Sequence, residues 1–179
     1  EAKSGLDAVI VAPVGVVGPY DFKLSEMGQV LSDLYSRRLR VLIGGAYDLV
    51  DVRDVARGAV LACKLGKAGE SYILSGERIT VNQVAQVLAR STGVPIPRWT
   101  VPTWLAKVFA VFAPVYYFLL RKKPIFSLYS IYTLNIQYKI SDKKARRELG
   151  YNSRPVKESL ADAIVWLRKN KWYNGKAKA

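Results

Sequence analysis

Three consecutive aliphatic residues near the start of the chain, Val9-Ile10-Val11, constrain its fold most strongly. The run does not alternate with polar residues, which is typical of a strand covered on both faces in a parallel sheet. Parallel strands need neighbours joined by crossover connections, and this chain offers few. A second such strand is predicted at 71–74, with shorter candidates at 40–43, 47–50 and 137–140. We therefore expect an α/β fold in which the strand at Val9-Ile10-Val11 lacks in-chain neighbours on both sides. Such a strand exposes a sheet edge, and we expect it to pair with another chain or with a missing half of the protein.

Amphipathic patterns predict helices between these strands. One has its apolar face on Leu24, Val30, Leu31, Leu34 and Tyr35. Another spans 51–65 and has these residues spaced for burial: Val52, Val55, Ala59, Ala62 and Cys63.

Capping residues delimit three further helices. Thr80 is predicted to cap one helix at its start, and Gly93 to end it. Ser141 is predicted to cap a short helix with Ala145 and Leu149 inside, closed by Gly150. Pro155 opens the last helix, whose inward side carries Val156, Leu160, Ile164 and Leu167.

The composition excludes several classes of site. Among 179 residues, 28 Lys and Arg against 14 Asp and Glu give a net charge of +14, and histidine is absent. Histidine triads and histidine-metal sites are therefore impossible, and no metal site is expected. Cys63 is the single cysteine, so no intrachain disulfide can form, and a reducing, cytoplasmic location is expected. The chain starts at Glu1 without a secretory leader pattern, so we expect that it was processed, trimmed or cut from something longer.

The basic residues are scattered in short runs such as 37–40, 121–123 and 143–147. No nucleic-acid-binding motif accompanies them, so nucleic acid is not an expected partner. The segment 101–120 is apolar apart from Lys107, but two prolines interrupt it. Three alternatives stay open for it: a buried or substrate-covering helix pair, an interfacial helix that makes the protein membrane-peripheral through 101–123, and a membrane span.

Two segments are candidates for ligand binding. The stretch from Pro13 to Pro19 follows a parallel-type strand, and ligands bind at the carboxyl ends of such strands. A plain strand-to-helix turn is the alternative. Asp51 and Asp54 begin a predicted helix, where carboxylates accept backbone N–H bonds, so a structural role is favoured over catalysis. Arg53 between them either pairs with an acid, faces an anionic ligand or is solvated.

These pieces, in their order, resemble the C-terminal half of an extended short-chain dehydrogenase/reductase, of the dihydroflavonol-4-reductase-like and NAD-dependent epimerase/dehydratase group. The matching segments are Gly5 to Pro13, Gly15 to Pro19, Tyr47 to Ala56, Gly69 to Gly76, Lys144 to Tyr151 and the helix ending near Trp166.

The resemblance implies a Rossmann-type NAD(P)-binding fold, of which this chain holds the last part. It also implies a smaller, mostly helical substrate lobe. Residues 1–76 would hold the end of the Rossmann-type domain with interleaved lobe elements, and 77–179 mainly the lobe, with a C-terminal helix and a basic tail.

The family's Gly-rich cofactor turn and its catalytic Tyr-x-x-x-Lys pair have no match here, so no catalytic residue is assigned. The resemblance thus implies a fragment of an NAD(P)-dependent oxidoreductase, inactive alone, whose full-length parent binds NAD or NADP. The alternative is a non-catalytic binding or membrane-peripheral scaffold. The expected partners are a small-molecule substrate and the missing half or another chain, including a homodimer.

The resemblance also assigns binding residues. Pro13, Val14, Gly15 and Val16 match the turn that approaches the nicotinamide end of the cofactor. Tyr47 stands where nucleotide-sugar enzymes carry a diphosphate-binding Arg, which argues against a nucleotide-diphosphate sugar. Together with the aromatic-rich segment 99–138, it argues for an apolar, ring-containing ketone or alcohol, with the loops around 20–24 and 125–132 as pocket walls. Aromatic residues gather in 99–138, where they either form core or line a pocket. The predicted substrate-binding residues are Tyr20, Phe22, Tyr47, Arg53, Tyr129 and Tyr132.

Overall fold

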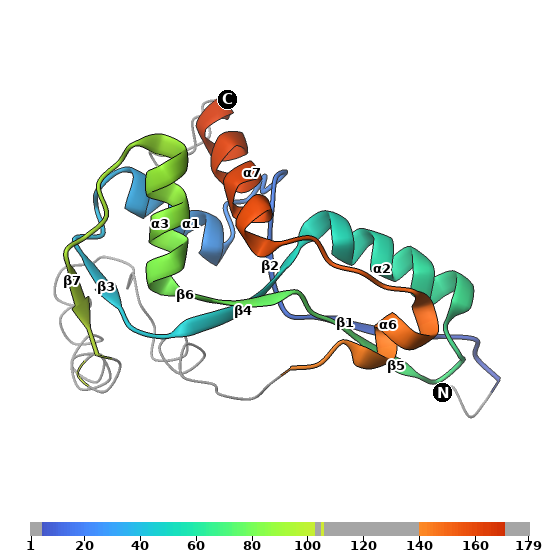
Figure 1. Ribbon diagram of the computed structural model, residues 1–179. Helices are drawn as coiled ribbons and strands as arrows, with labels where there is room; N and C mark the ends of the chain where they lie inside the picture. Colours follow the sequence, from blue (N-terminus) through green and yellow to red (C-terminus); the bar gives the residue numbers. More distant parts are fainter. Residues whose placement is uncertain (1–4, 103–104, 106–139, 171–179) are drawn as a thin grey trace, which may run out of the picture.

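The computed structural model describes residues 5–102, 105 and 140–170, and its strands form three small sheets within these ranges (Figure 1). The first sheet pairs β1 (Ile10–Pro13) with β5 (Ser71–Leu74) in parallel. In the second, β4 (Ala46–Asp51) lies parallel to β2 (Gly15–Val17) and antiparallel to β6 (Glu77–Thr80). In the third, β3 (Val41–Ile43) and β7 (Trp99–Val101) are parallel. Mainly parallel strands joined through helices confirm the predicted α/β class.

The helices pack in two groups. At one end of the molecule, α1 (Glu26–Tyr35), α3 (Val81–Thr92) and α7 (Val156–Lys169) contact one another. At the other end, α2 (Val52–Leu65) and α6 (Lys143–Leu149) pack on β1 and β5, as Figure 1 shows. Each group has its own hydrophobic cluster, centred on Leu31, Val84 and Leu160 in the first and on Tyr72 and Leu149 in the second. Both clusters draw residues from each side of residue 76, and the domain division there stays a prediction.

β1 has one hydrogen-bonded neighbour among the described strands, β5. The backbone N–H of Ile10 donates to Glu70 and that of Val14 donates to Leu74. The expectation that this strand is covered on both faces is wrong for this chain, because the Ile10 side chain is 61% exposed. The strand instead presents one open edge and exposed apolar side chains.

The capping predictions are confirmed at α3. Thr80 and Gln83 form a reciprocal capping box, and Gly93 ends the helix in the left-handed conformation at φ +74°. The N-cap position of α6 falls one residue later than predicted, on Asp142, whose side chain makes no capping bond. The Ser141 hydroxyl still accepts a hydrogen bond from the N–H of Lys143, the first residue of the helix, at 3.4 Å. Gly150 closes α6 in the left-handed conformation, as predicted.

The buried side of α2 matches the prediction at Ala62 and in part at the half-buried Val52 and Val55, but otherwise differs from it. Its buried residues are Asp54, Gly58 and Ala62, spaced four apart, whereas Ala59 and Cys63 are exposed. The hydrophobic pattern missed this stripe because two of its members are a carboxylate and a glycine. Gly58 allows close packing, since a Cβ there would lie 2.5 Å from Leu74 Cδ1.

Among the described residues, no helix is both long enough and apolar enough to cross a membrane. Most of the apolar segment 101–120 and residues 137–139 of a predicted strand lie outside the described residues. Three short strands escaped prediction, namely β2, β6 and β7. Each has three or four residues, too few for a reliable alternation pattern.

Candidate functional site

The predicted cofactor-contacting residues 13–16 run without a break from the end of β1 into β2, and this stretch is called the 13–16 edge below. Pro13 ends β1, Val14 bridges the two strands, and Gly15 and Val16 begin β2. Gly15 allows β2 to lie close against β4, since a Cβ there would stand 3.0 Å from both Asp48 O and Leu49 Cδ2. Pro13, Gly15 and Val16 are exposed. The edge therefore offers backbone and apolar surface at the carboxyl end of a parallel strand.

The chain then enters loop 18–25, which runs from Gly18 to Ser25. Tyr20 and Leu24 adopt positive φ angles of 72° and 56°, a conformation that costs about 1 kcal/mol or more for residues with a side chain. The carboxylate of Asp21 accepts hydrogen bonds from the Ser25 N–H and hydroxyl at 2.7–2.8 Å. The Ser25 hydroxyl in turn caps α1 by accepting from Gly28 N at 3.1 Å. These bonds fix the loop in its strained form.

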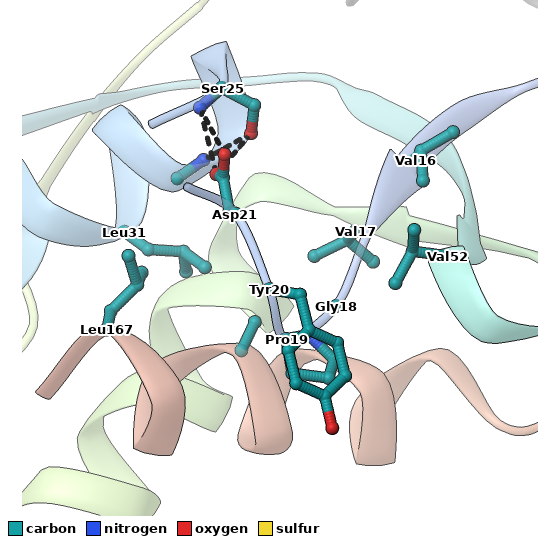
Figure 2. A pocket seen from close by; sticks show the side chains of 12 residues that line it. Val16, Val17, Gly18, Pro19, Tyr20, Asp21, Ser25, Leu31, Val52 and Leu167 are labelled. Carbon is teal, nitrogen blue, oxygen red and sulfur yellow. Dashed lines mark hydrogen bonds between the residues drawn. The ribbon is translucent and has the colours of Figure 1, made fainter. Parts of the chain in front are cut away.

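A pocket of about 580 Å³, counting the space at its open mouth, lies between this loop, β2 and three helices. Most of its wall is apolar, and Figure 2 shows Val17 and Leu31 facing each other across it, with the Asp21 carboxylate turned toward Ser25. The lining residues are Val16, Val17, Gly18, Pro19, Tyr20, Asp21, Ser25, Gly28, Leu31, Val52, Ala163 and Leu167.

Aromatic side chains stand at the rim of this pocket. The rings of Tyr20 and Phe22 lie 6.4 Å apart, centre to centre, at an interplanar angle of 27°. Phe22 meets Trp166 of α7 edge to face at 5.3 Å, which ties the loop to that helix. Tyr20 is 61% exposed and Phe22 is 70% exposed. The rim therefore combines a fixed backbone with a large uncovered apolar surface.

Two buried carboxylates lie at the start of α2, on either side of Val52, which lines the pocket, and Arg53. Asp51, with no exposed surface, caps α2 by accepting from Arg53 N at 2.7 Å, which confirms the predicted helix-start role. The Arg53 guanidinium also binds Asp51 through Nε and Nη2, and reaches Asp162 of α7 at 2.6 Å. Burial by itself raises the pKa of Asp51, but the hydrogen bonds from Arg53 outweigh it and lower the pKa.

Asp54, 1% exposed, pairs with a residue far away in the chain. Arg154 donates to it from the backbone N–H at 2.8 Å, from Nε at 3.1 Å and from Nη2 at 2.9 Å. Burial again raises the pKa of Asp54, and the bonds from Arg154 reverse this and lower it. The two carboxylates thus hold the segment before α7 and α7 itself against the start of α2.

The structure unites some of the predicted site residues and separates others. Val16 and Tyr20 line the same pocket, with Phe22 beside it. Tyr47 lines a different, smaller cavity with Leu34 and Val81, where burial and then nearby Glu26 raise its pKa. Arg53 is held by two carboxylates, so its role toward a ligand stays a prediction. Tyr129 and Tyr132 lie outside the described residues.

Sequence reasoning missed the pocket's polar side. Ser25 and Gly28 were not assigned, and Asp21 was included only as part of the predicted pocket-wall loop around 20–24, although Asp21 and Ser25 are spaced to bond just before a helix. The contributions of Val52 and Ala163 depend on how α2 and α7 approach loop 18–25, which a local pattern does not encode.

Parallel strands with covering helices, and an exposed glycine-containing turn at the carboxyl end of one of them, are the arrangement of a Rossmann-type α/β protein. Comparisons with known proteins agree. The chain is 37% identical over 170 residues to sterol demethylase protein B of Methylococcus capsulatus, covering 94% of this chain and 52% of that protein. It is 34% identical over 176 residues to a putative dihydroflavonol 4-reductase of Synechocystis, covering 93% and 50%.

Solved structures show the same correspondence. A nucleoside-diphosphate-sugar epimerase from Pseudomonas aeruginosa matches with a TM-score of 0.74 at 25% identity, covering 96% of this chain and 51% of the epimerase. The Bordetella bronchiseptica enzyme WbmF, solved in complex with NADH, shares the fold with a TM-score of 0.66 at 20% identity, covering 93% of this chain and 47% of the enzyme. No protein-family model matches the chain.

The chain spans about half the length of the curated relatives it matches. The resemblance to one half of the extended short-chain dehydrogenase/reductases is therefore confirmed, and it is consistent with the C-terminal half. The Rossmann-type fold class is confirmed with it.

Proposed function

We propose that this chain is part of an NAD(P)-dependent oxidoreductase that acts on a carbonyl or alcohol group of a small, apolar substrate. The observation that carries the proposal is the exposed edge from Pro13 to Val16 opening directly onto an apolar pocket, since Val16 belongs to both. In this arrangement a substrate in the pocket lies beside the edge predicted to meet the nicotinamide.

The residues at the edge suit the nicotinamide end of a dinucleotide. The exposed Pro13, Gly15 and Val16 give backbone and van der Waals surface to a flat ring. The segment 13–17 carries no charged side chain, so the pyrophosphate and the adenine end must be held by residues elsewhere. A bound NAD(P)H would supply the hydride. The 13–16 edge would orient its ring, and the apolar pocket would exclude water.

The catalytic acid belongs outside this sequence. The family's Tyr-x-x-x-Lys pair and Gly-rich turn have no match here, so we propose that this chain alone is inactive and that both lie in the remaining part of the whole protein. The single cysteine, an exposed free thiol, suits the proposed cytoplasmic location.

Titration with NAD(P)H tests this function. With the protein in its full natural length, NADH or NADPH fluorescence is expected to rise and saturate below millimolar concentration. Val16→Glu is expected to weaken this binding about tenfold or more, because it places a carboxylate beside the nicotinamide edge. Val165→Glu is the matched control, since Val165 is 59% exposed on α7 and outside the pocket, and it should bind as the wild type does.

If the full-length protein shows no NAD(P)H response at millimolar concentration, the proposed oxidoreductase function is wrong. The non-catalytic scaffold is then favoured. If the Val16→Glu and wild-type proteins bind NAD(P)H equally and have the same melting temperature, the proposed contact between the 13–16 edge and the nicotinamide is wrong.

A further inference from the structure

The pocket wall carries a negative charge and no positive one. Asp21 is the one acidic residue that lines it, and none of the other lining residues is basic. Its carboxylate is fixed by Ser25 at the start of α1, where Ser25 also caps the helix. A free helix N-terminus attracts anions, whereas this one is already occupied by a side-chain carboxylate and a capping hydroxyl.

The position of Asp21 is also set by packing. A Cβ on Gly28 would lie 2.2 Å from the Asp21 Oδ2 atom, so the absence of a side chain at Gly28 leaves the room that the carboxylate fills. The charge therefore stands at a defined place in the wall. Any anionic group that entered would have to approach this carboxylate, and like charges repel.

The rim of the pocket favours aromatic or alicyclic rings in a ligand. Tyr20 lines the pocket and leaves most of its ring uncovered, while the strained backbone at φ 72° holds it there. Phe22 extends the surface and is braced on Trp166. Exposed rings on a fixed backbone lose little conformational freedom when they stack on a ligand.

From this combination we infer that the pocket selects neutral ring-containing ligands, which Tyr20 contacts at the mouth, and that Asp21 acts as a specificity determinant that excludes anionic ligands such as nucleoside diphosphates. The inference names the substrate class of the site and therefore rests on the proposed function. It concerns the pocket of this chain and needs no bound cofactor.

Equilibrium binding without cofactor tests the inference. The probe is 6-propionyl-2-dimethylaminonaphthalene, a neutral bicyclic ketone whose emission shifts to the blue in apolar surroundings, added to the protein in its full natural length. Its carboxylate analogue, 6-dimethylamino-2-naphthoate, is the anionic probe. The ketone is expected to bind with a blue shift and at least tenfold more tightly than the carboxylate, and millimolar uridine diphosphate should not displace it.

Two variants and one control locate the effect. Asp21→Asn keeps an acceptor for Ser25, and it should tighten binding of the carboxylate about fivefold while leaving the ketone unchanged. Tyr20→Ala should weaken the ketone about tenfold. Glu158→Gln removes one negative charge from the exposed side of α7, outside the pocket, and should change neither probe.

If Asp21→Asn has an unaltered melting temperature and binds the anionic probe no more tightly than the wild type, the proposed role of Asp21 is wrong. Displacement of the ketone by uridine diphosphate, or ketone binding that Tyr20→Ala does not weaken, would overturn the ligand class. Ketone binding with the expected variant effects but no NAD(P)H response would support this inference while the proposed function fails, and the reverse result would do the opposite.

Discussion

Replacing Arg154 with methionine is expected to lower the free energy of unfolding by about 3 kcal/mol, because it leaves buried Asp54 without most of its hydrogen-bond donors. Arg154 supplies two side-chain bonds to this carboxylate, and Arg57 at 3.3 Å is the cation that remains. Since Arg154 itself is 31% exposed, the loss is placed at the lower end of the range for breaking a buried pair. Chemical denaturation at neutral pH measures it.

The same variant should shift the response to acid. The pKa values of Asp51 and Asp54 are lowered in the folded protein. A carboxylate with a depressed folded pKa stabilises the fold above its unfolded pKa of about 4, and this contribution is lost as the pH falls through the folded pKa. Removing Arg154 raises the pKa of Asp54 toward or above its unfolded value, so acid unfolding should begin at a higher pH than in the wild type.

Arg147→Met serves as the control. Arg147 is 74% exposed and pairs with Glu148 on the surface of α6, so its loss should cost at most about 0.5 kcal/mol. Equal destabilisation by the two variants would contradict a structural role for the Arg154–Asp54 pair.

Alanine at Gly76 is expected to destabilise the fold by about 3 kcal/mol through overpacking. A Cβ there would lie 2.4 Å from the Leu49 carbonyl oxygen and 3.2 Å from Val50 Cα. Both are backbone atoms of β4, which is held between β2 and β6 and cannot move aside cheaply. Thermal and denaturant unfolding measure the change.

Gly93→Ala is the comparison for this variant. Gly93 has φ +74°, and nothing lies within 4 Å of the added Cβ, so its cost is conformational alone, about 1 kcal/mol. A smaller effect at Gly76 than at Gly93 would contradict the close approach of the 76 turn to β4.

Elements with strong local patterns could be predicted from the sequence. The periodic apolar faces of α3 and α7 and the left-handed glycines at 93 and 150 gave correct helices. The buried stripe of α2 could not be found in this way, because Asp54 is buried by a pairing with Arg154, one hundred residues away. Hydrophobicity carries no information about such an ion pair.

The candidate site could likewise be predicted only in part from the sequence. Pro13 to Val16 could be predicted as a candidate site because they follow a branched strand at its carboxyl end, where ligands bind in open α/β sheets, and their contact with a cofactor stays a prediction. The pocket behind it depends on α7 returning to loop 18–25 and on Asp21 folding back onto Ser25, which are tertiary and strained local features. Tyr47 was assigned from the resemblance alone, and the structure places it in a separate cavity.

The open edge of β1 is the feature that most directly marks this chain as one half of a larger Rossmann-type sheet. The N–H groups of Ile10 and Val14 point toward β5, so the alternation of a parallel strand directs the Val11 N–H to the other edge. Amide hydrogen exchange at Val11, measured in the protein at its full natural length, tests whether a further strand pairs there. We predict protection as strong as that of Tyr72 N–H on the paired β5, and a Val11 amide that exchanges as fast as a solvent-exposed one would contradict the account.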